Sequence, residues 1–391
     1  MVKAIKVMLI PNNVQKTKMF QYAGASRFAY NWALAREIEN YEKGEKFISD
    51  AELRKEFTKL RHSDEYAWLL NISNNVTKQA IKDACTAYKN FFKGLQKFPR
   101  FKSRKRSMPK FYQDNVKIQF SNTHVKFEGF SSSRKANKQK MNWVRLAEHG
   151  RIPTDVKYMN PRISFDGLNW WISVCVEFPD CRETLNDDGV GIDLGIKDLA
   201  ICSDGTKYKN INKSQKVKKL EKQKRRLQRS ISRSYEKNKK GESYCKTNNV
   251  IKKEKLLLKR NHRLTNIRKN YLNQTISEIV NRKPRFICIE DLNVSGMMKN
   301  RHLSKAVQQQ GFYEFRRQME YKSKWNNIQV IIADRFFPSS KLCSCCGKIK
   351  KDLKLSERIY KCECGNVVDR DLQAALNLKK YGQDVLKRSV A

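Results

Sequence analysis

Three acidic residues stand at the edge of an apolar strand or at the start of a helix, where carboxylates could bind divalent metal ions. Asp193 interrupts the run Val-Gly-Ile-Asp-Leu-Gly-Ile, and a charge inside such a strand is costly unless a metal ion or a partner offsets it. Glu290 ends the run Arg-Phe-Ile-Cys-Ile-Glu, and period-two alternation places Glu290 and Asp291 on opposite faces, so only one of them can face Asp193. Asp371 stands where a helix over residues 371–381 is expected to begin.

Each of these carboxylates has a simpler interpretation when it is taken alone. Asp193 could be an exposed strand end, Glu290 a turn or helix cap, and Asp371 a capping acid, since negative charge is favourable at a helix N-terminus. Their order along the chain instead favours a shared site of the ribonuclease H-like kind, with acids on a first strand, a later central strand and a closing helix. In that arrangement carboxylates bind two divalent ions about 4 Å apart, which activate water and stabilise the leaving oxygen of a phosphodiester.

The segments that would position these carboxylates fit the same fold. The sequence predicts a hairpin at 190–203, basic helices at 213–281, a strand at 285–291, one helix at 305–326 and a strand at 328–334. The five histidines lie outside the acidic motifs, and no Gly-x-x-x-x-Gly-Lys-Ser/Thr phosphate loop occurs. A His-dependent nuclease and an ATP-driven motor are therefore disfavoured.

Five of the eleven cysteines lie between residues 343 and 364, a clustering typical of a metal site in a reducing compartment. Cys343 and Cys346 form a C-x-x-C pair, and fifteen residues separate Cys346 from Cys362 and Cys364. Two thiolate pairs beside turn glycines predict a tetrahedral Zn²⁺ knuckle with these four ligands. The second pair is C-x-C and Cys345 is left over, so reduced thiols without a metal are the alternative.

The chain carries 82 Lys and Arg against 39 Asp and Glu, a net charge of +43. Such a chain repels itself unless a polyanion neutralises it, and nucleic acid is the expected polyanion. An acidic membrane surface is the weaker alternative, because no single amphipathic basic helix dominates. Since no apolar run has transmembrane length and the N-terminus lacks a signal-peptide core, we expect a cytoplasmic protein.

Basic residues concentrate in two segments. Between residues 213 and 270, 22 Lys and Arg face four Glu, which favours nucleic-acid contact over a solvated helix face, and residues 98–106 form a basic linker with interleaved aromatics. Asn75 and Gln79 share one helix face, from which they could pair with adenine in a major groove or simply lie exposed. The candidate nucleic-acid contacts are Asn75, Gln79, Arg100, Lys102, Arg104, Lys222, Arg225, Arg226 and Arg229.

The patterns predict an α/β domain combined with all-α and all-β parts. Residues 1–15 are expected to supply the first strand of a small antiparallel β-barrel, residues 16–97 a helical bundle, and residues 98–186 the remainder of the barrel. The α/β domain would span residues 187–391, with the zinc knuckle inserted at 338–367.

Motifs along nearly the whole chain resemble those of the transposon-encoded TnpB (OrfB) proteins, the compact relatives of miniature type V CRISPR effectors. The matching motifs are Tyr30-Asn31-Trp32, Tyr88–Phe92, Phe101–Ser103, Gly191–Gly195, Ile289–Leu292, Pro338–Lys341 with the cysteines, and Asp369–Asn377. The chain departs from the family pattern at its second cysteine pair, which is usually C-x-x-C, and at Gln373, where Asn is frequent.

The resemblance implies an RNA-guided DNA endonuclease of a transposon, which would be associated with the nucleoid of a prokaryotic cell. A guide RNA from the transposon end would pair with one DNA strand, while the helical recognition domain and the barrel (wedge domain) read a short transposon-associated motif. A RuvC-like domain would then cut double-stranded DNA, with Asp193, Glu290 and Asp371 as the catalytic carboxylates and ligands of two Mg²⁺ or Mn²⁺ ions. One protein would bind each guide RNA, and the zinc would be structural.

Two other functions fit parts of the same pattern. An RNA-guided DNA-binding repressor with weak nuclease activity would share the charge and the knuckle, but the intact carboxylate triad argues against it. A DNA strand-transferring transposase would use the same three carboxylates, and a ribonuclease H-like core alone does not exclude it.

Overall fold

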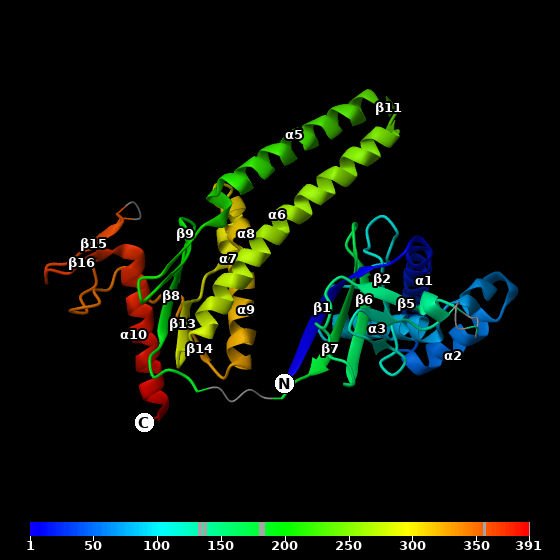
Figure 1. Cartoon of the computed structure of the whole chain (residues 1–391), viewed down its shortest axis with the longest axis horizontal. Helices are drawn as coiled ribbons and strands as arrows, with labels where there is room; N and C mark the ends of the chain where they lie inside the picture. Colours follow the sequence, from blue (N-terminus) through cyan, green and yellow to red (C-terminus); the bar gives the residue numbers. More distant parts are fainter. Residues whose placement is uncertain (132–134, 136–138, 180–183, 355–356, 391) are drawn as a thin grey trace. The chain divides into compact units, whose positions relative to one another are not determined.

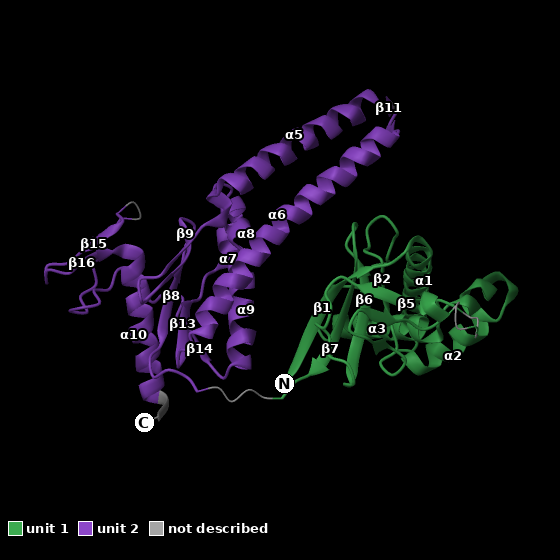
Figure 2. Ribbon diagram, viewed as in Figure 1, with its two compact units in different colours: residues 1–179 green, residues 180–391 purple. Residues whose placement is uncertain are grey.

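The computed structural model describes residues 1–131, 135, 139–179, 184–354 and 357–390. The chain forms two compact units, residues 1–179 and residues 180–391 (Figure 2). Residues 180–183, beside the predicted domain boundary at 186, and residues 355–356 of the predicted knuckle lie outside the described residues.

The first unit contains a seven-stranded antiparallel sheet in the order β2-β6-β7-β1-β5-β4-β3. Its strands are β1 (Val2–Ile10), β2 (Lys110–Tyr112), β3 (Gln119–Phe120), β4 (His124–Lys126), β5 (Trp143–Leu146), β6 (Tyr158–Phe165) and β7 (Trp170–Glu177). The N-terminal strand β1 joins the sheet between β7 and β5. Among the described residues the sheet does not close into the predicted barrel. Its edge strands β2 and β3 are only three and two residues long, and its apolar face is covered by helices instead.

Those helices are α1 (Asn13–Glu42), α2 (Asp50–Arg61) and α3 (Asn74–Phe92), with 3-10 turns η1 (Asp64–Asn71) and η2 (Lys140–Asn142). A capping box between Asn12 and Gln15 starts α1. Met19 and Tyr22 of α1 share one buried core with Phe111 and Trp170 of the sheet. The helical segment and the strands therefore fold as one unit; their separate assignment as recognition and wedge domains stays a prediction.

The second unit is built on a five-stranded sheet in the order β10-β9-β8-β13-β14. Its strands are β8 (Val190–Leu194), β9 (Asp198–Cys202), β10 (Lys207–Lys209), β13 (Phe286–Glu290) and β14 (Gln329–Ala333). The strands β8, β13 and β14 are parallel, and β9 and β10 extend the sheet antiparallel. The hairpin, the central strand and the outer strand lie where the sequence predicts them.

Helices cover both faces of this sheet (Figure 1). Helix α10 (Arg370–Val390) packs on Phe286 and Cys288, while α6 (Asn248–Asn281) and α9 (Phe312–Trp325) pack on Ile287 and Ile289. The helix predicted over residues 305–326 is in fact two helices, α8 (Ser304–Gln310) and α9, because Gly311 adopts a left-handed φ of 70°.

Two long helices form a hairpin in the second unit (Figure 1). Helix α5 (Gln215–Lys237) and α6 share a small apolar cluster around Val217, Leu220 and Leu264. The remaining elements are η3 (Ile211–Lys213), β11 (Lys239–Lys240), β12 (Ser243–Tyr244), α7 (Val294–Lys299), β15 (Ile359–Lys361) and β16 (Val367–Asp369). Among the described residues, no helix has the length and apolar character needed to cross a membrane.

Candidate active site and cysteine cluster

The register of two parallel strands brings Asp193 and Glu290 side by side. In β8 and β13, Ile192 pairs with Ile289, so Asp193 and Glu290 are the next residues along the two strands. Side chains at equivalent positions of neighbouring strands point to the same face of a sheet. Ile192 and Ile289 both belong to the core on the α6 and α9 side. The two carboxylates therefore face the opposite side, where α10 lies.

A close approach of backbones places Asp371 over this pair. A Cβ atom at Gly191 of β8 would lie 2.1 Å from the carbonyl oxygen of Ala375 and 2.3 Å from the amide nitrogen of Lys379. Glycine at this position therefore lets α10 rest directly on β8. Asp371 stands in the first turn of α10, so the seating of the helix sets its position relative to Asp193.

All three carboxylates line one cavity of about 420 Å³. Burial raises the pKa of Asp193 well above its usual value, and the charges of Glu290 and Asp371 raise it further. Burial also raises the pKa of Glu290, against the lowering effect of a hydrogen bond from Ser339. Carboxylate oxygens that line one cavity suit hard divalent cations, which would relieve the repulsion that raises the pKa of Asp193. The donor set thus fits Mg²⁺ or Mn²⁺.

The neighbouring acid Asp291 lies outside this cavity. It accepts hydrogen bonds from Arg316 at 2.7 Å and from Arg335 at 2.9 Å. The hydrogen bond from Arg335 is the main reason that the pKa of Asp291 is lowered. Alternation along the strand thus separates Glu290, which faces the cavity, from Asp291, which is held by two arginines.

A second neighbouring acid, Asp369, takes the capping role that the sequence also allowed for Asp371. Its Oδ1 accepts hydrogen bonds from the backbone N–H groups of Asp371 at 3.0 Å and Leu372 at 3.4 Å. Its other oxygen accepts a hydrogen bond from Lys207 at 2.9 Å. The carboxylate of Asp371 has a different neighbour, Arg358, at 3.8 Å, and lines the cavity with Asp193 and Glu290.

The four predicted cysteine ligands come together in space. The sulfur atoms of Cys343, Cys346, Cys362 and Cys364 all lie within 4.8 Å of one another. The pairs Cys343–Cys364 and Cys346–Cys362 are each 3.6 Å apart, close to the ~3.8 Å that tetrahedral zinc thiolates require. Burial opposes ionisation of Cys343, but backbone N–H groups and the Asn366 side chain outweigh it and lower its pKa to about 6. The cluster could therefore hold zinc.

The basic residues predicted on α5 lie in solvent. Lys222, Arg225, Arg226 and Arg229 are all exposed. Arg225 also lines a cavity of about 540 Å³ between α5, α6 and α8. Other cationic side chains lining this cavity are Lys224, Arg268, Lys269 and Lys305.

In the first unit, Arg100 and Arg104 are exposed, but three other candidate contacts are engaged within the protein. Asn75 donates a hydrogen bond to Glu128 at 3.2 Å, and Gln79 donates one to Asp83 at 2.9 Å. The third, Lys102, is bonded through its backbone N–H and carbonyl to the Asn31 side chain, and its ammonium lies over the Tyr30 ring.

Burial, reinforced by the charge of Lys110, lowers the pKa of Lys102 to about 7, against the raising effect of Asp83. The contacts of Lys102 with Asn31 and Tyr30 hold the linker against α1, and its contact with nucleic acid stays a prediction.

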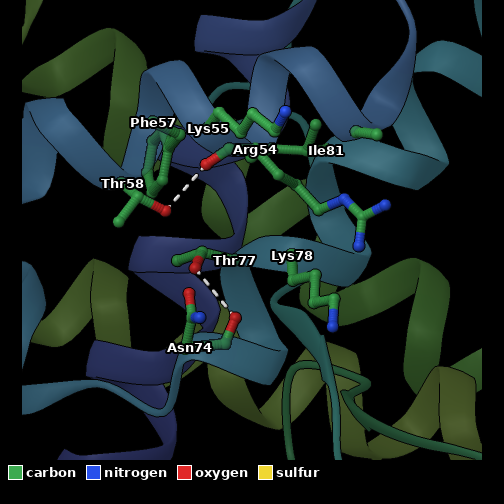
Figure 3. A pocket seen from close by; sticks show the side chains of 9 residues that line it. Arg54, Lys55, Phe57, Thr58, Asn74, Thr77, Lys78 and Ile81 are labelled. Carbon is green, nitrogen blue, oxygen red and sulfur yellow. Dashed lines mark hydrogen bonds between the residues drawn. The ribbon is translucent and has the colours of Figure 1, made fainter.

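A smaller cavity of about 310 Å³ lies between α2 and α3, where no contact was predicted. Figure 3 shows Arg54 and Lys78 extending toward the same side of this opening, with Lys55 beside them. Lys55 and Lys78 are exposed. These residues lie on two separate helices and form no local sequence motif, so the sequence did not predict that they line one cavity.

Ser339 is a further site residue that the sequence did not single out. Its hydroxyl donates a hydrogen bond to Oε1 of Glu290. It belongs to the motif Pro338–Lys341, which contributed to the resemblance but suggested no role for the serine.

Three family models match separate parts of the chain. The helix-turn-helix domain of OrfB from IS605 matches residues 1–46, the IS605 OrfB model described as "Probable transposase" matches residues 173–301, and the Cas12f1-like TNB domain matches residues 312–378.

Curated relatives match almost the whole chain. "Putative RNA-guided DNA endonuclease InsQ" of Escherichia coli (strain K12) is 31% identical, over 98% of this chain and 93% of its own length. A "Putative RNA-guided DNA endonuclease" of Streptomyces pristinaespiralis is 29% identical, over 97% of this chain and 89% of its own length. The chain therefore belongs to the TnpB (OrfB) family of transposon-encoded proteins.

A solved structure shares the fold. The protein in the cryo-EM structure of the Cas12f1-sgRNA-target DNA complex aligns with a TM-score of 0.60 over 97% of this chain and 98% of that chain. The sequences are 12% identical, so this likeness concerns the arrangement of the elements.

Proposed function

We propose that the protein is an RNA-guided DNA endonuclease. It binds a guide RNA derived from a transposon end, recognises a short transposon-associated motif, and cleaves guide-complementary double-stranded DNA by metal-dependent hydrolysis. The observation that carries the proposal is the cavity shared by Asp193, Glu290 and Asp371. The names of the relatives from Escherichia coli and Streptomyces pristinaespiralis support it.

In this proposal the three carboxylates hold two Mg²⁺ or Mn²⁺ ions. Such ions, when bound, supply an activated water and stabilise the leaving oxygen of a phosphodiester. The chain's own contribution is to fix the carboxylates: the register of β8 and β13 sets Asp193 beside Glu290, and α10 brings Asp371. Lys197 and Arg358 line the same cavity and would bind the phosphates next to the scissile bond.

Base pairing with the guide would carry the sequence information, so the protein needs cationic surfaces more than base-reading side chains. The exposed basic face of α5, and the cavity lined by Arg225, Lys269 and Lys305, supply such a surface in the second unit. The opening lined by Lys55 and Lys78 supplies another in the first. Zinc held by the four cysteines would stabilise the fold around α10. One protein would bind each guide RNA.

A strand-transferring transposase is the second candidate. It is favoured by one specific observation, the match of residues 173–301 to a model described as "Probable transposase". The same three carboxylates would serve that reaction. An RNA-guided repressor needs none of these carboxylates, so their presence around one cavity argues against that function.

The test is to purify the protein from cells carrying its native flanking DNA and to sequence the RNA that stays bound at high salt. A discrete RNA from the transposon end, and Mg²⁺-dependent cutting of a plasmid that matches it, are expected. Strand-transfer products formed on transposon-end DNA without RNA would establish the transposase. Guided binding without cutting would establish the repressor.

A further inference from the structure

Two buried amide side chains tie α10 to the segment that leads into the cysteine cluster. Gln373 and Asn377, with 0% and 1% of their surface exposed, lie four residues apart on one face of α10. Both donate hydrogen bonds of 2.7 Å to the carbonyl of Leu342, and Asn377 also donates one of 2.7 Å to the carbonyl of Ser339. Buried amides with satisfied donors fix backbone position closely, so these bonds hold residues 339–342 against the helix.

One end of this network reaches the candidate active site. The hydroxyl of Ser339, which is 6% exposed, donates a hydrogen bond to Oε1 of Glu290. With one carboxylate oxygen held in this way, the torsion of the Glu290 side chain is restricted. Partners of this kind orient metal ligands and tune their affinity.

The other end of the network reaches the cysteines. Oε1 of Gln373 accepts hydrogen bonds from Ser344 at 3.0 Å and from Asn366 at 3.3 Å. The Asn366 amide also donates to the sulfur of Cys343 at 3.5 Å. A continuous path of hydrogen bonds therefore runs from Cys343 through Gln373 to Glu290, with residues 339–342 as its middle.

We propose that Ser339, Gln373 and Asn377 are positioning residues through which the cysteine cluster sets the orientation of Glu290. This inference rests on the proposed function, since it assigns Glu290 to a divalent-metal site. The cluster then does more than stabilise the fold: its occupancy by zinc fixes Asn366 and Cys343, and thereby the segment that carries Ser339. Weakening the path lowers the affinity of the carboxylate site for its metal ions, while nucleic-acid binding is unaffected.

The path can be cut without touching a cysteine or a carboxylate. Gln373→Met keeps the length of the side chain and removes its hydrogen bonds, and Ser339→Ala removes the hydroxyl that Ser339→Thr retains. The exposed Gln383 of the same helix gives the matched control Gln383→Met. The measurements are zinc content, guide-RNA retention, direct Mn²⁺ binding followed by electron paramagnetic resonance, and the Mn²⁺ concentration that gives half-maximal DNA cleavage.

We expect Gln373→Met and Ser339→Ala to keep the zinc content and guide RNA of the wild type, and to weaken Mn²⁺ binding about 10-fold or more. The concentration for half-maximal cleavage should rise by the same factor. Ser339→Thr and Gln383→Met should match the wild type.

Unchanged Mn²⁺ binding in Ser339→Ala and Gln373→Met would overturn the inference. So would loss of zinc from Gln373→Met with normal Mn²⁺ binding in Ser339→Ala, because the glutamine would then serve the knuckle alone. If Gln373→Met does not fold, the comparison of Ser339→Ala with Ser339→Thr decides. If the wild type with its guide cuts no DNA at any Mn²⁺ concentration, the proposed function fails, and the Mn²⁺-binding comparison still decides the positioning role.

Discussion

Replacing Gly191 by alanine should separate the carboxylates of the candidate site. The added Cβ would lie 2.1 Å from the carbonyl oxygen of Ala375 and 2.3 Å from the amide nitrogen of Lys379, both backbone atoms of α10. Ordinary van der Waals contact begins near 3.4 Å, so the helix has to withdraw by about 1 Å. Because Asp371 stands in the first turn of the same helix, it moves away from Asp193.

Two effects of different size follow from this displacement. Overpacking of this kind costs about 1–3 kcal/mol of unfolding free energy. A misplacement of about 1 Å in a reacting constellation costs on the order of 100-fold in rate. Gly191→Ala should therefore stay folded with a lowered melting temperature, while its cleavage of guide-matched DNA falls by about two orders of magnitude.

Calorimetry and single-turnover cleavage, run on the same preparations, measure the two effects. Gly24→Ala is the control substitution: Gly24 lies within α1 and a Cβ there meets no atom within 4 Å. That change should raise stability by about 0.5–1 kcal/mol and leave cleavage unaltered. If Gly191→Ala had the stability and cleavage of the wild type, the direct packing of α10 on β8 at Gly191 would be refuted.

Three other changes test separate parts of the account. Lys102, whose pKa is lowered to about 7, takes up a proton on unfolding, so stability should rise between about pH 7 and 10, and Lys102→Met should abolish that rise in thermal unfolding. A second change replaces the four exposed basic residues of α5, Lys222, Arg225, Arg226 and Arg229, by Gln. The slope of log RNA affinity against log salt concentration should become shallower by about 3. Zinc removal by a chelator, or Cys343→Ser with Cys346→Ser, should lower the melting temperature of the second unit, because structural zinc binding is folding free energy.

Each of these expectations has a contrary result. A flat stability profile for the wild type between pH 7 and 10 would show that Lys102 is solvated. An unchanged salt slope would remove α5 from the nucleic-acid surface. Equal zinc content in the wild type and the double cysteine variant would place the metal elsewhere.

The order of the carboxylates along the chain predicted that they share a site, and the structure places all three around one cavity. Apolar strands that end in acids, with period-two alternation, separate Glu290 from Asp291, and the structure pairs Asp291 with Arg316 and Arg335. The spacing of the four cysteines likewise predicted a cluster that the structure brings together. The catalytic and metal-binding roles of these residues stay predictions.

Features set by contacts between distant segments could not be predicted. The choice of Asp369 as the cap of α10 depends on β16 running directly into the helix. The position of Lys102 depends on the Asn31 side chain, which lies 71 residues earlier in the chain and is hydrogen-bonded to the Lys102 backbone. Among the described residues the sheet of the first unit does not close, and it shares its core with α1, a packing arrangement that strand patterns do not encode.

The most direct test of the central claim compares two adjacent acids. Glu290→Gln removes a charge that faces the cavity, whereas Asp291→Asn removes one held by surface arginines. Both variants should retain guide RNA. Cleavage of guide-matched plasmid in Mg²⁺ should fall on the order of 100-fold or more in Glu290→Gln and stay within a few-fold of wild type in Asp291→Asn, since exposed ion pairs contribute about 1 kcal/mol or less. Wild-type cleavage by Glu290→Gln, or equal loss in both variants, would contradict the account.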